Sequence, residues 1–596
     1  MLLACVALVP RPAAGQPAFA EVRSLPEWFA LPGTPGHVDD LHLGTGLPRS
    51  WMGHVAGAVA MRDGLLPGLE PWPGLEEITA PIAWFDSVAV VVGEDAGWRG
   101  FGASLVELRA YAQPSRSARP RATFTLVNGS SAQDRAGLLL QRGGQRSWLR
   151  GGALSEKRSG VGLLDLRGQH AWFAELGLRR GAHEWSGTFS QQGSAGSTRA
   201  DASEVDLSGG SRPPYVGFEE AARGETGALH WRWARASHRV RVELARSHDH
   251  RESFEPILVD LFAEREAQRT SLVVELESVA GRRARALRLA LEQDRVWRSV
   301  DFLAGLPERA ARRRAVWLAL RERRALAGGE LELQLGAGHD GTPARTGERT
   351  QLAPSASWSR GDAGRRWRLQ AGRIVTPLWS DLAPGTGAFV QDVWFGGGSF
   401  RAGRAERAWL EAGALASETG NRALLARSPV RDVSLRLGWS RDVVRVQDAQ
   451  LTLALGGRWG PFGADASGFT RVRPAGSTFA AVDAARGARG GLESRFRVFA
   501  GDLGVRLRFE AAWTGERDSE PAPGLPSPPR AIPAQTTLAA SVGLTLGDAT
   551  IVLRADNLSD RRELQVWGDP SRGFPGTPAV GAGRQFRAEL VWPFYN

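Results

Sequence analysis

The sequence of 596 residues is poor in the residues that build disulfides, metal-thiolate sites and membrane helices. It holds one cysteine, Cys5, one lysine, Lys157, and three tyrosines. Cys5 follows "LLA" as a lipoprotein acceptor would, but a place inside a signal core is the simpler interpretation, and the mature chain is then expected to lack disulfides and thiolate metal sites. Beyond the N-terminus no run approaches the roughly 18 apolar residues of a spanning helix. If the chain crosses a membrane, it has to cross with strands.

Positive charge is abundant and comes almost wholly from arginine. Lysine and arginine total 75 against 64 acids, which gives a formal net charge of +11. The arginines are spread along alternating segments instead of gathering in a patch, and no nucleic-acid-binding module is recognisable. We therefore expect no nucleic-acid partner; an anionic lipid surface or anionic solutes would explain the charge equally well.

The first residues resemble a secretory signal. "MLLACVALVPRPAAGQPAFA" has a short apolar stretch followed by small residues, and Ala18-Phe19-Ala20 fits an A-x-A cleavage site. No basic residue precedes the apolar stretch, so we expect the true start to lie upstream. The signal is assigned to residues 1–20, and we expect it to be incomplete at its start.

From about residue 121 the sequence falls into short segments of strict alternation, the pattern of strands with one apolar face. In "LGVRLRFE" Leu503 to Phe509 alternate with Gly504, Arg506, Arg508 and Glu510, and "VSLRLGWS" at 433–440 alternates with Arg436 on its polar face. Similar segments carry Arg239, Arg241 and Glu243. Alternation alone does not distinguish a soluble sandwich from a membrane barrel, because both have one apolar face.

The connections between these segments favour the barrel. Tight connections at 235–237, 280–283, 361–364, 460–462, 501–504 and 547–548 alternate with long ones at about 193–225, 249–268, 296–312, 376–387, 472–489, 516–534 and 558–582. Short periplasmic turns and long extracellular loops produce this rhythm in outer-membrane barrels. Trp residues near strand ends, such as Trp439, Trp513 and Trp592, would form the aromatic girdles.

These patterns predict an all-β protein, a transmembrane antiparallel barrel of about 22 strands over residues 121–596. A barrel of that size has a wide lumen and is normally plugged. Residues 21–120 lack the alternation and are assigned to a small plug-like domain. The last strand, "GRQFRAELVWPFYN", places Phe586, Leu590, Trp592 and Phe594 toward lipid, with Arg587 and Glu589 toward the lumen.

Both ends of this barrel resemble the TonB-dependent receptor family. "FDSVAVVVGEDAGWRGFGASLVELRAYAQP" at 85–114 resembles the end of that family's plug. "RADNLSDRRE" carries Asn557, Leu558 and Asp560 of a family-like element, and "GAGRQFRAELVWPF" carries Gly583 and Arg584 of a closing strand. The resemblance implies the outer membrane of a Gram-negative-type bacterium, with its lipid and lipopolysaccharide as surroundings, and the barrel-assembly machinery as a partner.

The sequence also departs from the family. The plug-like region is short, "VGEDAG" stands where the family tends to have Arg-Gly-Pro, and no TonB box is found in the given sequence. Two alternatives stay open: an upstream start supplies the box, or the protein has none. Two hypotheses follow from this. The first is a TonB-dependent-receptor-like transporter that imports a scarce bulky solute such as a ferric chelate, with TonB as a partner; the second is a passive porin or adhesin-like barrel without energy coupling.

Residues for chemistry are scarce. No G-x-S-x-G, H-E-x-x-H or phosphate-binding loop occurs, so we expect no enzyme and no cofactor. His248, Asp249 and His250 open one predicted extracellular loop, and His339 and Asp340 lie in another on the same side. Such residues contact metal chelates in some sites, but a solvated loop is the commoner explanation. Lumen-facing arginines such as Arg239, Arg436 and Arg506 would either attract anionic cargo or pair with acids such as Glu243 and Glu510; we favour pairing.

Overall fold

The computed structural model describes residues 36–39, 47–50, 57–61, 87–93, 95–102, 106–111, 118–130, 133–161, 164–200, 216–255, 261–301, 311–341, 350–362, 364–378, 389–404, 407–420, 422–426, 438–442, 446–472, 485–518, 531–561, 564–568, 578–580 and 584–595. The predicted signal, residues 1–20, lies outside these ranges. No helix in the described part of the chain is long and apolar enough to cross a membrane.

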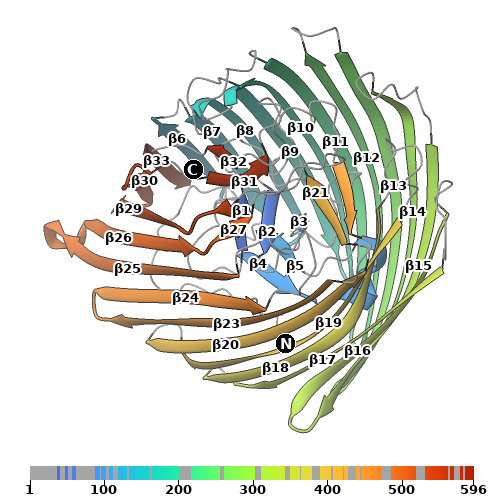
Figure 1. Ribbon diagram of the computed structural model, residues 1–596. Helices are drawn as coiled ribbons and strands as arrows, with labels where there is room; N and C mark the ends of the chain where they lie inside the picture. The colour runs from blue at the N-terminus through green and yellow to red at the C-terminus, as the bar shows by residue number, and fades with distance from the viewer. Residues whose placement is uncertain are drawn as a thin grey trace.

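Twenty-two antiparallel strands close into one barrel, which confirms the predicted fold class (Figure 1). The barrel strands are β6 (Arg121–Gly129), β7 (Gln133–Gly143), β8 (Ser147–Val161), β9 (Leu164–Arg180), β10 (His183–Ala200), β11 (Val216–Arg235), β12 (His238–Glu255), β13 (Leu261–Ala280), β14 (Arg283–Asp301), β15 (Ala311–Leu326), β16 (Gly329–Asp340), β17 (Thr350–Gly361), β18 (Arg365–Leu378), β19 (Phe389–Arg404), β20 (Ala408–Gly420), β23 (Val446–Trp459), β24 (Phe462–Val472), β25 (Arg486–Val498), β26 (Leu503–Thr514), β29 (Gln535–Leu546), β30 (Ala549–Asp556) and β33 (Gln585–Tyr595).

Smaller elements lie before the barrel and in its connections. A three-stranded sheet has the order β3 (Gly57–Met61), β5 (Val106–Tyr111), β4 (Ser87–Val92), and Figure 1 shows it inside the ring of barrel strands. Helix α2 (Ala96–Arg99) and the 3-10 turn η3 (Gly100–Gly102) connect β4 to β5. The remaining elements are β1 (Gly36–Asp39), β2 (Leu47–Ser50), β21 (Arg422–Ala426), β22 (Gly438–Asp442), η6 (Phe499–Gly501), β27 (Arg517–Asp518), β28 (Ala531–Ile532), β31 (Leu564–Gly568) and β32 (Pro578–Val580).

The apolar face of each strand points out of the barrel. Leu229 exposes 64% of its surface and Leu244 46%, while their neighbours Ala228 and Glu243 are buried inside. The same sidedness recurs around the ring, for example at Leu335, Leu369, Leu453 and Leu553. An exterior of exposed leucines facing water would be an aggregation surface, whereas the same belt suits the acyl chains of a bilayer.

Aromatic side chains mark both edges of this belt. The His183 ring stacks on Trp185 and Trp231, with centroids 5.4 and 6.0 Å apart, near the tight turn that joins β9 to β10. Toward the other end of β9, Trp172 lies 5.2 Å from Phe189 and its indole N–H donates to Gln191. Amphipathic rings of this kind favour the boundary between lipid and water.

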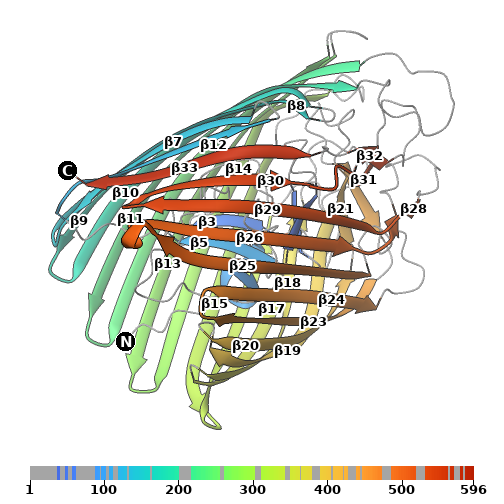
Figure 2. The ribbon, with the colours of Figure 1, turned by 90° about the vertical axis from the view of Figure 1, so that its left-hand side faces the viewer.

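The barrel wall is uneven in height. Strands β9 to β14 have 17 to 20 residues, more than the roughly 10 that cross a bilayer at a tilt. Strands β24 to β30 of the barrel have 8 to 13 residues. Figure 2 shows that the long strands extend beyond the ends of the short strands (Figure 2). The turns 236–237, 281–282 and 547–548 lie at one end of the barrel, whereas the short connections between β6 and β7 and between β8 and β9 lie at the other end.

Two predictions about local structure were wrong. Residues 433–440 were expected to form a barrel strand, but the three of them that the structure describes, 438–440, belong to β22, which pairs with β21 in a separate hairpin within the long connection between β20 and β23. Residues 427–437, including Arg436, lie outside the described residues. The expected loops at 193–225 and 249–268 are largely strand, because β10 to β13 continue far beyond the apolar belt. Apolar and polar residues alternate in any strand that has one apolar and one polar face. The pattern therefore did not distinguish a strand of the barrel wall from a strand of a separate hairpin.

Candidate functional site: a plug turn docked on the barrel wall

A compact turn from the plug-like region is held against the inside of the barrel. Residues 93–102 contain three positive backbone φ angles, 62° at Gly93, 57° at Asp95 and 77° at Gly100, which bend the chain around the single helical turn α2. Ala96, Trp98 and Phe101 are buried, with at most 7% of their surface exposed. The turn lies on β15 to β18, so it contacts four neighbouring barrel strands.

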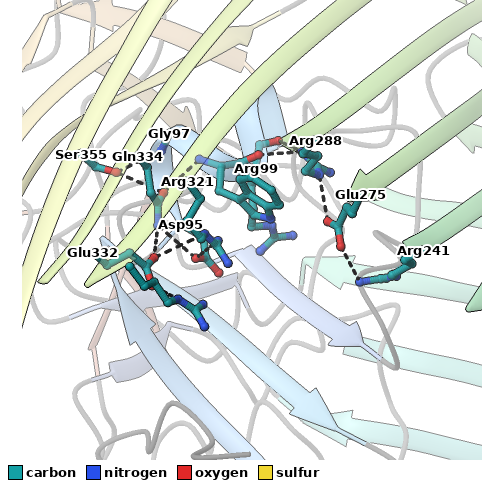
Figure 3. Close-up of polar contacts among 12 residues, drawn as sticks. Asp95, Gly97, Arg99, Arg241, Glu275, Arg288, Arg321, Glu332, Gln334 and Ser355 are labelled. Atoms are coloured by element: carbon teal, nitrogen blue, oxygen red, sulfur yellow. Dashed lines mark hydrogen bonds and ion pairs between the residues drawn. The ribbon is translucent and has the colours of Figure 1, made fainter. Parts of the chain in front are cut away.

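Neutral hydrogen bonds fix the backbone of this turn to the wall. The Trp98 N–H donates to Gln334 Oε1 at 3.0 Å, and the hydroxyl of Ser355 donates to the same oxygen at 3.1 Å. The indole N–H of Trp317 donates to the Gly97 carbonyl at 3.1 Å. The bonds of Trp98 with Gln334 and of Trp317 with Gly97 join residues 236 and 220 positions apart in the sequence, and Figure 3 shows Gln334 and Ser355 converging on the turn (Figure 3).

Charged groups complete the attachment at both ends of α2. Arg288 donates from Nη1 to the carbonyls of Trp98 and Arg99, at 2.9 and 3.0 Å, where the helical turn leaves its carbonyls unpaired. At the opposite end Arg321 bonds to the Asp95 carboxylate, and its guanidinium lies 4.2 Å from the centre of the Trp98 ring. Bonds to charged groups are about twice as strong as neutral ones.

Glycines allow the two backbones to approach each other. A Cβ on Gly97 would lie 2.5 Å from the Ala353 carbonyl oxygen, and a Cβ on Gly336 would lie 2.2 Å from the Gly97 carbonyl oxygen. A Cβ on Gly100 would meet the Trp317 ring at 2.5 Å. Trp317 in turn packs edge to face on Phe101, with centroids 4.9 Å apart. The wall and the turn are complementary in shape, and side chains at these glycines would separate them.

A buried charge network lies next to the turn on β13 to β16. Arg313 bonds to Asp294 at 2.8 Å and to Asp340 at 3.1 Å, and Arg269 bonds to Asp294 at 2.7 Å. The Arg313 guanidinium also lies 5.7 Å from the Phe101 ring centre. The network therefore connects the lumenal wall to the docked turn.

The predicted substrate residues do not form one site. His248 and His250 lie in β12, on the same face as the exposed Leu244, and they bond to Glu266 at 3.1 Å and Glu252 at 2.8 Å on the barrel exterior. Asp249 falls on the opposite, lumenal face. The prediction that these residues open a loop was wrong, since β12 continues to Glu255.

The second predicted pair, His339 and Asp340, also lies on opposite faces of its strand. His339 and Asp340 end strand β16 instead of lying in a loop; His339 faces outward beside Thr350, and Asp340 is fully buried in the network with Arg313. Within the described part of the chain no cluster of three metal-ligating side chains occurs. Any contact of these five residues with substrate stays a prediction.

Lumenal arginines are paired with acids, as favoured from the sequence. Arg241 bonds to Glu243 at 2.7 Å and to Glu275 at 3.4 Å, and Arg239 bonds to Glu277 at 3.2 Å. On the other side of the ring, Glu493 accepts from Arg506 at 2.7 Å and Glu510 accepts from Arg508 at 2.8 Å. Much of the positive charge that the sequence places on the inner face is thus neutralised within the wall.

The C-terminal elements have defined structural places. Strand β33 pairs with β30 on one side and with β6 on the other. Phe586, Trp592 and Phe594 are exposed on its outer face, Leu590 is half-buried, and Glu589 is buried inside. Chain order and pairing therefore bring the last strand beside the first at the point where the barrel closes.

The residues around Asn557 form a hydrogen-bonded turn that links the end of β30 to the start of β33. Asn557 and Asp560 have φ angles of 49° and 51°, which Asn and Asp tolerate better than most residues. The Asn557 side chain donates to the Arg561 carbonyl, the Leu558 N–H donates to the Leu538 carbonyl, and the Arg584 N–H donates to the Asp560 carboxylate at 2.7 Å. Gly583 lies outside the described residues.

Sequence reasoning missed the residues that hold the turn. Gln334, Trp317, Arg288 and Arg321 were not singled out, because each lies on an ordinary alternating strand. The stretch "AGWRGFG" did carry a signal, since glycines flank two aromatic residues in a region otherwise without alternation. A buried aromatic next to glycine is typical of close backbone contact.

Comparison with known proteins supports the architecture. No protein-family profile matches the chain, and no curated protein matches it in sequence. Among solved structures it is similar to the FrpB iron transporter from Neisseria meningitidis (TM-score 0.74, 10% identity, 97% of each chain covered). It is also similar to the ferric yersiniabactin uptake receptor FyuA from Yersinia pestis (0.71, 13%, 97% of this chain and 96% of that one). A third is the ferric enterobactin receptor PfeA from Pseudomonas aeruginosa (0.73, 11%, 96% and 97%).

These similarities extend over nearly the full length of both chains. The chain therefore has the fold of outer-membrane receptors of the TonB-dependent type, and the resemblance seen at its two ends is confirmed at the level of fold.

Proposed function

We propose that this protein is an outer-membrane TonB-dependent transporter that imports a scarce bulky solute, a ferric chelate or a similar metal complex. The observation that carries the proposal is the docked turn 93–102 inside a closed 22-strand barrel. A barrel that holds its own plug on the inner wall is built to stay closed until the plug moves. Solved structures that share the fold include an iron transporter, a ferric yersiniabactin uptake receptor and a ferric enterobactin receptor.

The passive-porin alternative is not favoured, because a constitutively open pore has no use for a bonded obstruction in its lumen. Transport here instead requires force on the plug region, supplied by TonB from the inner membrane. The protein acts as a receptor and carrier without a catalytic step. The outer-membrane lipid and the barrel-assembly machinery are its other partners.

Uptake of radiolabelled iron chelates tests the proposal. A strain lacking the gene and the same strain carrying the full chain are compared on a panel of ferric siderophores, with and without a protonophore. We expect at least one chelate to be taken up only when the full chain is present and the membrane is energised. Flux that persists after de-energisation contradicts energised transport, and a protein that does not fractionate with the outer membrane contradicts both barrel hypotheses.

A further inference from the structure

The hydrogen-bonded ladder between β17 and β18 ends before the two strands do. It reaches the pair Ser355 and Gly372 and stops there. Beyond this pair β17 continues as residues 350–354 beside β16, and β18 continues as residues 373–378 beside β19. Elsewhere in the described barrel, neighbouring strands pair to within one or two residues of the end of one of them. We call the two facing stretches the seam.

Prolines on both strands weaken any continuation of this ladder. If the register went on, Pro354 would lie opposite Arg373. In the same register Pro377 would lie opposite Thr350. The Leu352 carbonyl accepts a hydrogen bond from Arg373 of β18, so Leu352 and the residues two positions to either side turn their backbone groups toward β18. Proline has no N–H, and two of these three pairs would therefore lack a donor.

The Arg373 side chain crosses the seam. Its Nη1 donates to the Leu352 carbonyl at 2.9 Å and its Nη2 donates to Gln351 Oε1 at 3.3 Å, both on β17. The same guanidinium donates to the carboxylate of Asp392 on β19, at 2.8 and 3.1 Å. It also lies 5.5 Å from the ring centre of Trp394, which is exposed on the outer face. A charged side chain thus links the two strands where their backbones do not pair.

The docked turn covers the seam on the lumenal side. A Cβ on Gly97 would lie 2.5 Å from the Ala353 carbonyl oxygen of β17. Val375 of β18 belongs to the buried cluster that contains Trp98 and Phe101 of the turn. Ala353 and Val375 are each 1% exposed. The turn therefore packs on both strands at the place where they are not bonded to each other, and unpaired strand edges in a membrane require such a cover.

We propose that the seam is the place where the barrel wall opens during transport, and that the docked turn and Arg373 keep it closed. When the turn leaves the wall, the seam loses its lumenal cover and the bonds of Arg373 remain as a link between the two strands. β17 and β18 then move apart at this level. Opening at one seam widens the passage for a bulky solute without unfolding any strand. The proposal rests on the plug movement given under Proposed function and adds a movement of the wall to it.

Pulsed EPR distances between two nitroxide labels on the full chain, in lipid nanodiscs, test the proposal. The seam pair is Leu320→Cys on β15 with Gly396→Cys on β19, and the control pair is Leu453→Cys on β23 with Val542→Cys on β29. Leu320, Leu453 and Val542 are exposed, and Gly396 has open space at its Cβ position. Each pair spans four strand intervals, so the labelled positions start about 19 Å apart.

The turn is released by Arg288→Met/Arg321→Met, because both arginines hold the turn and neither lies on β17 or β18. We expect a second distance, longer by ~5 Å or one strand spacing, to appear in the seam pair and not in the control pair. Adding Arg373→Gln should raise the ratio of long to short distances about tenfold, because it removes the charged bonds across the seam. Heat-dependent gel mobility checks that every variant is a folded barrel.

The converse variant, Pro354→Val/Pro377→Val, supplies the two missing N–H donors, and Pro461→Val in the turn between β23 and β24 is its matched control. With the turn released, we expect the seam pair to keep its short distance in the first variant and to lengthen as before in the second. An unchanged seam distance in Arg288→Met/Arg321→Met/Arg373→Gln overturns the proposal, as does equal lengthening of the control pair. The distances are read without solute or TonB, so a failed uptake experiment and a failed seam experiment remain separate results.

Discussion

Single glycines decide how closely the plug turn approaches the wall. Gly97 faces the Ala353 carbonyl, and Gly336 faces the Gly97 carbonyl, at distances that admit no side chain. Gly97→Val is therefore expected to overpack the contact, at a cost of about 1–3 kcal/mol. Hydrogen exchange of the Trp98 amide, which bonds to Gln334, should accelerate at least about fivefold.

The matched control for this change is Gly396→Val, which adds the same side chain in open space. Unchanged protection of Trp98 in Gly97→Val would show that the contact with the wall is not what holds the turn.

Arg288 is the residue on which the C-terminal end of α2 depends. Its Nη1 bonds to two carbonyls of the turn and its Nε lies 3.3 Å from Glu275. Arg288→Met keeps much of the side-chain volume but loses these charged bonds, which contribute about 1.5–3 kcal/mol. Because the mature chain is expected to have no cysteine, Ala96→Cys, buried at 1% exposure, can report opening of the turn through its rate of maleimide labelling.

In the Ala96→Cys background, we expect Arg288→Met to raise the labelling rate about tenfold or more. Arg285→Met, on the same strand but with 62% of its side chain exposed, should leave the rate unchanged. Equal rates in the two variants would contradict the role given to Arg288.

Among the elements, the final strand has the largest consequence for assembly. Phe594 pairs with Ala122 and Tyr595 with Arg121, and Phe594 packs on Trp592 at 5.8 Å. Removing residues 594–596 would leave the start of β6 as an unpaired edge, which membrane barrels do not tolerate. We expect loss of heat-modifiable mobility and of recovery in the outer-membrane fraction.

A chain lacking only Asn596 is the control, because Asn596 lies beyond the last residue of β33. Normal assembly of the longer truncation would mean that the C-terminal strand has been misinterpreted.

The strands also show how much of the fold could be predicted from the sequence. Strict alternation with a charged inner set, as in residues 503–510, correctly predicted wall strands because a barrel needs that pattern along every strand. The same pattern at 433–440 was misleading for the described residues 438–440, because they belong to the separate β21–β22 hairpin and not to the wall. His248 was placed in a loop because polar residues replace leucine there, yet β12 continues past the belt as wall.

At the scale of the whole molecule, the sequence of the turn indicated close backbone contact, but its partners on the barrel wall could not be predicted. Trp98 contacts Gln334 and Trp317 contacts Gly97 across separations of 236 and 220 residues. No local pattern encodes such a contact. The 22-strand closure itself was predictable, because it follows from strand number and connection rhythm.

The proposed function requires the barrel to be closed by its own N-terminal region. Single-channel conductance of the purified full chain in a planar bilayer tests it most directly, alongside a chain lacking residues 21–120. Removing an obstruction from a barrel of 22 strands should leave a wide aqueous pore. We expect a silent full chain and large steady openings after the deletion; steady openings of the full chain would contradict closure by the N-terminal region.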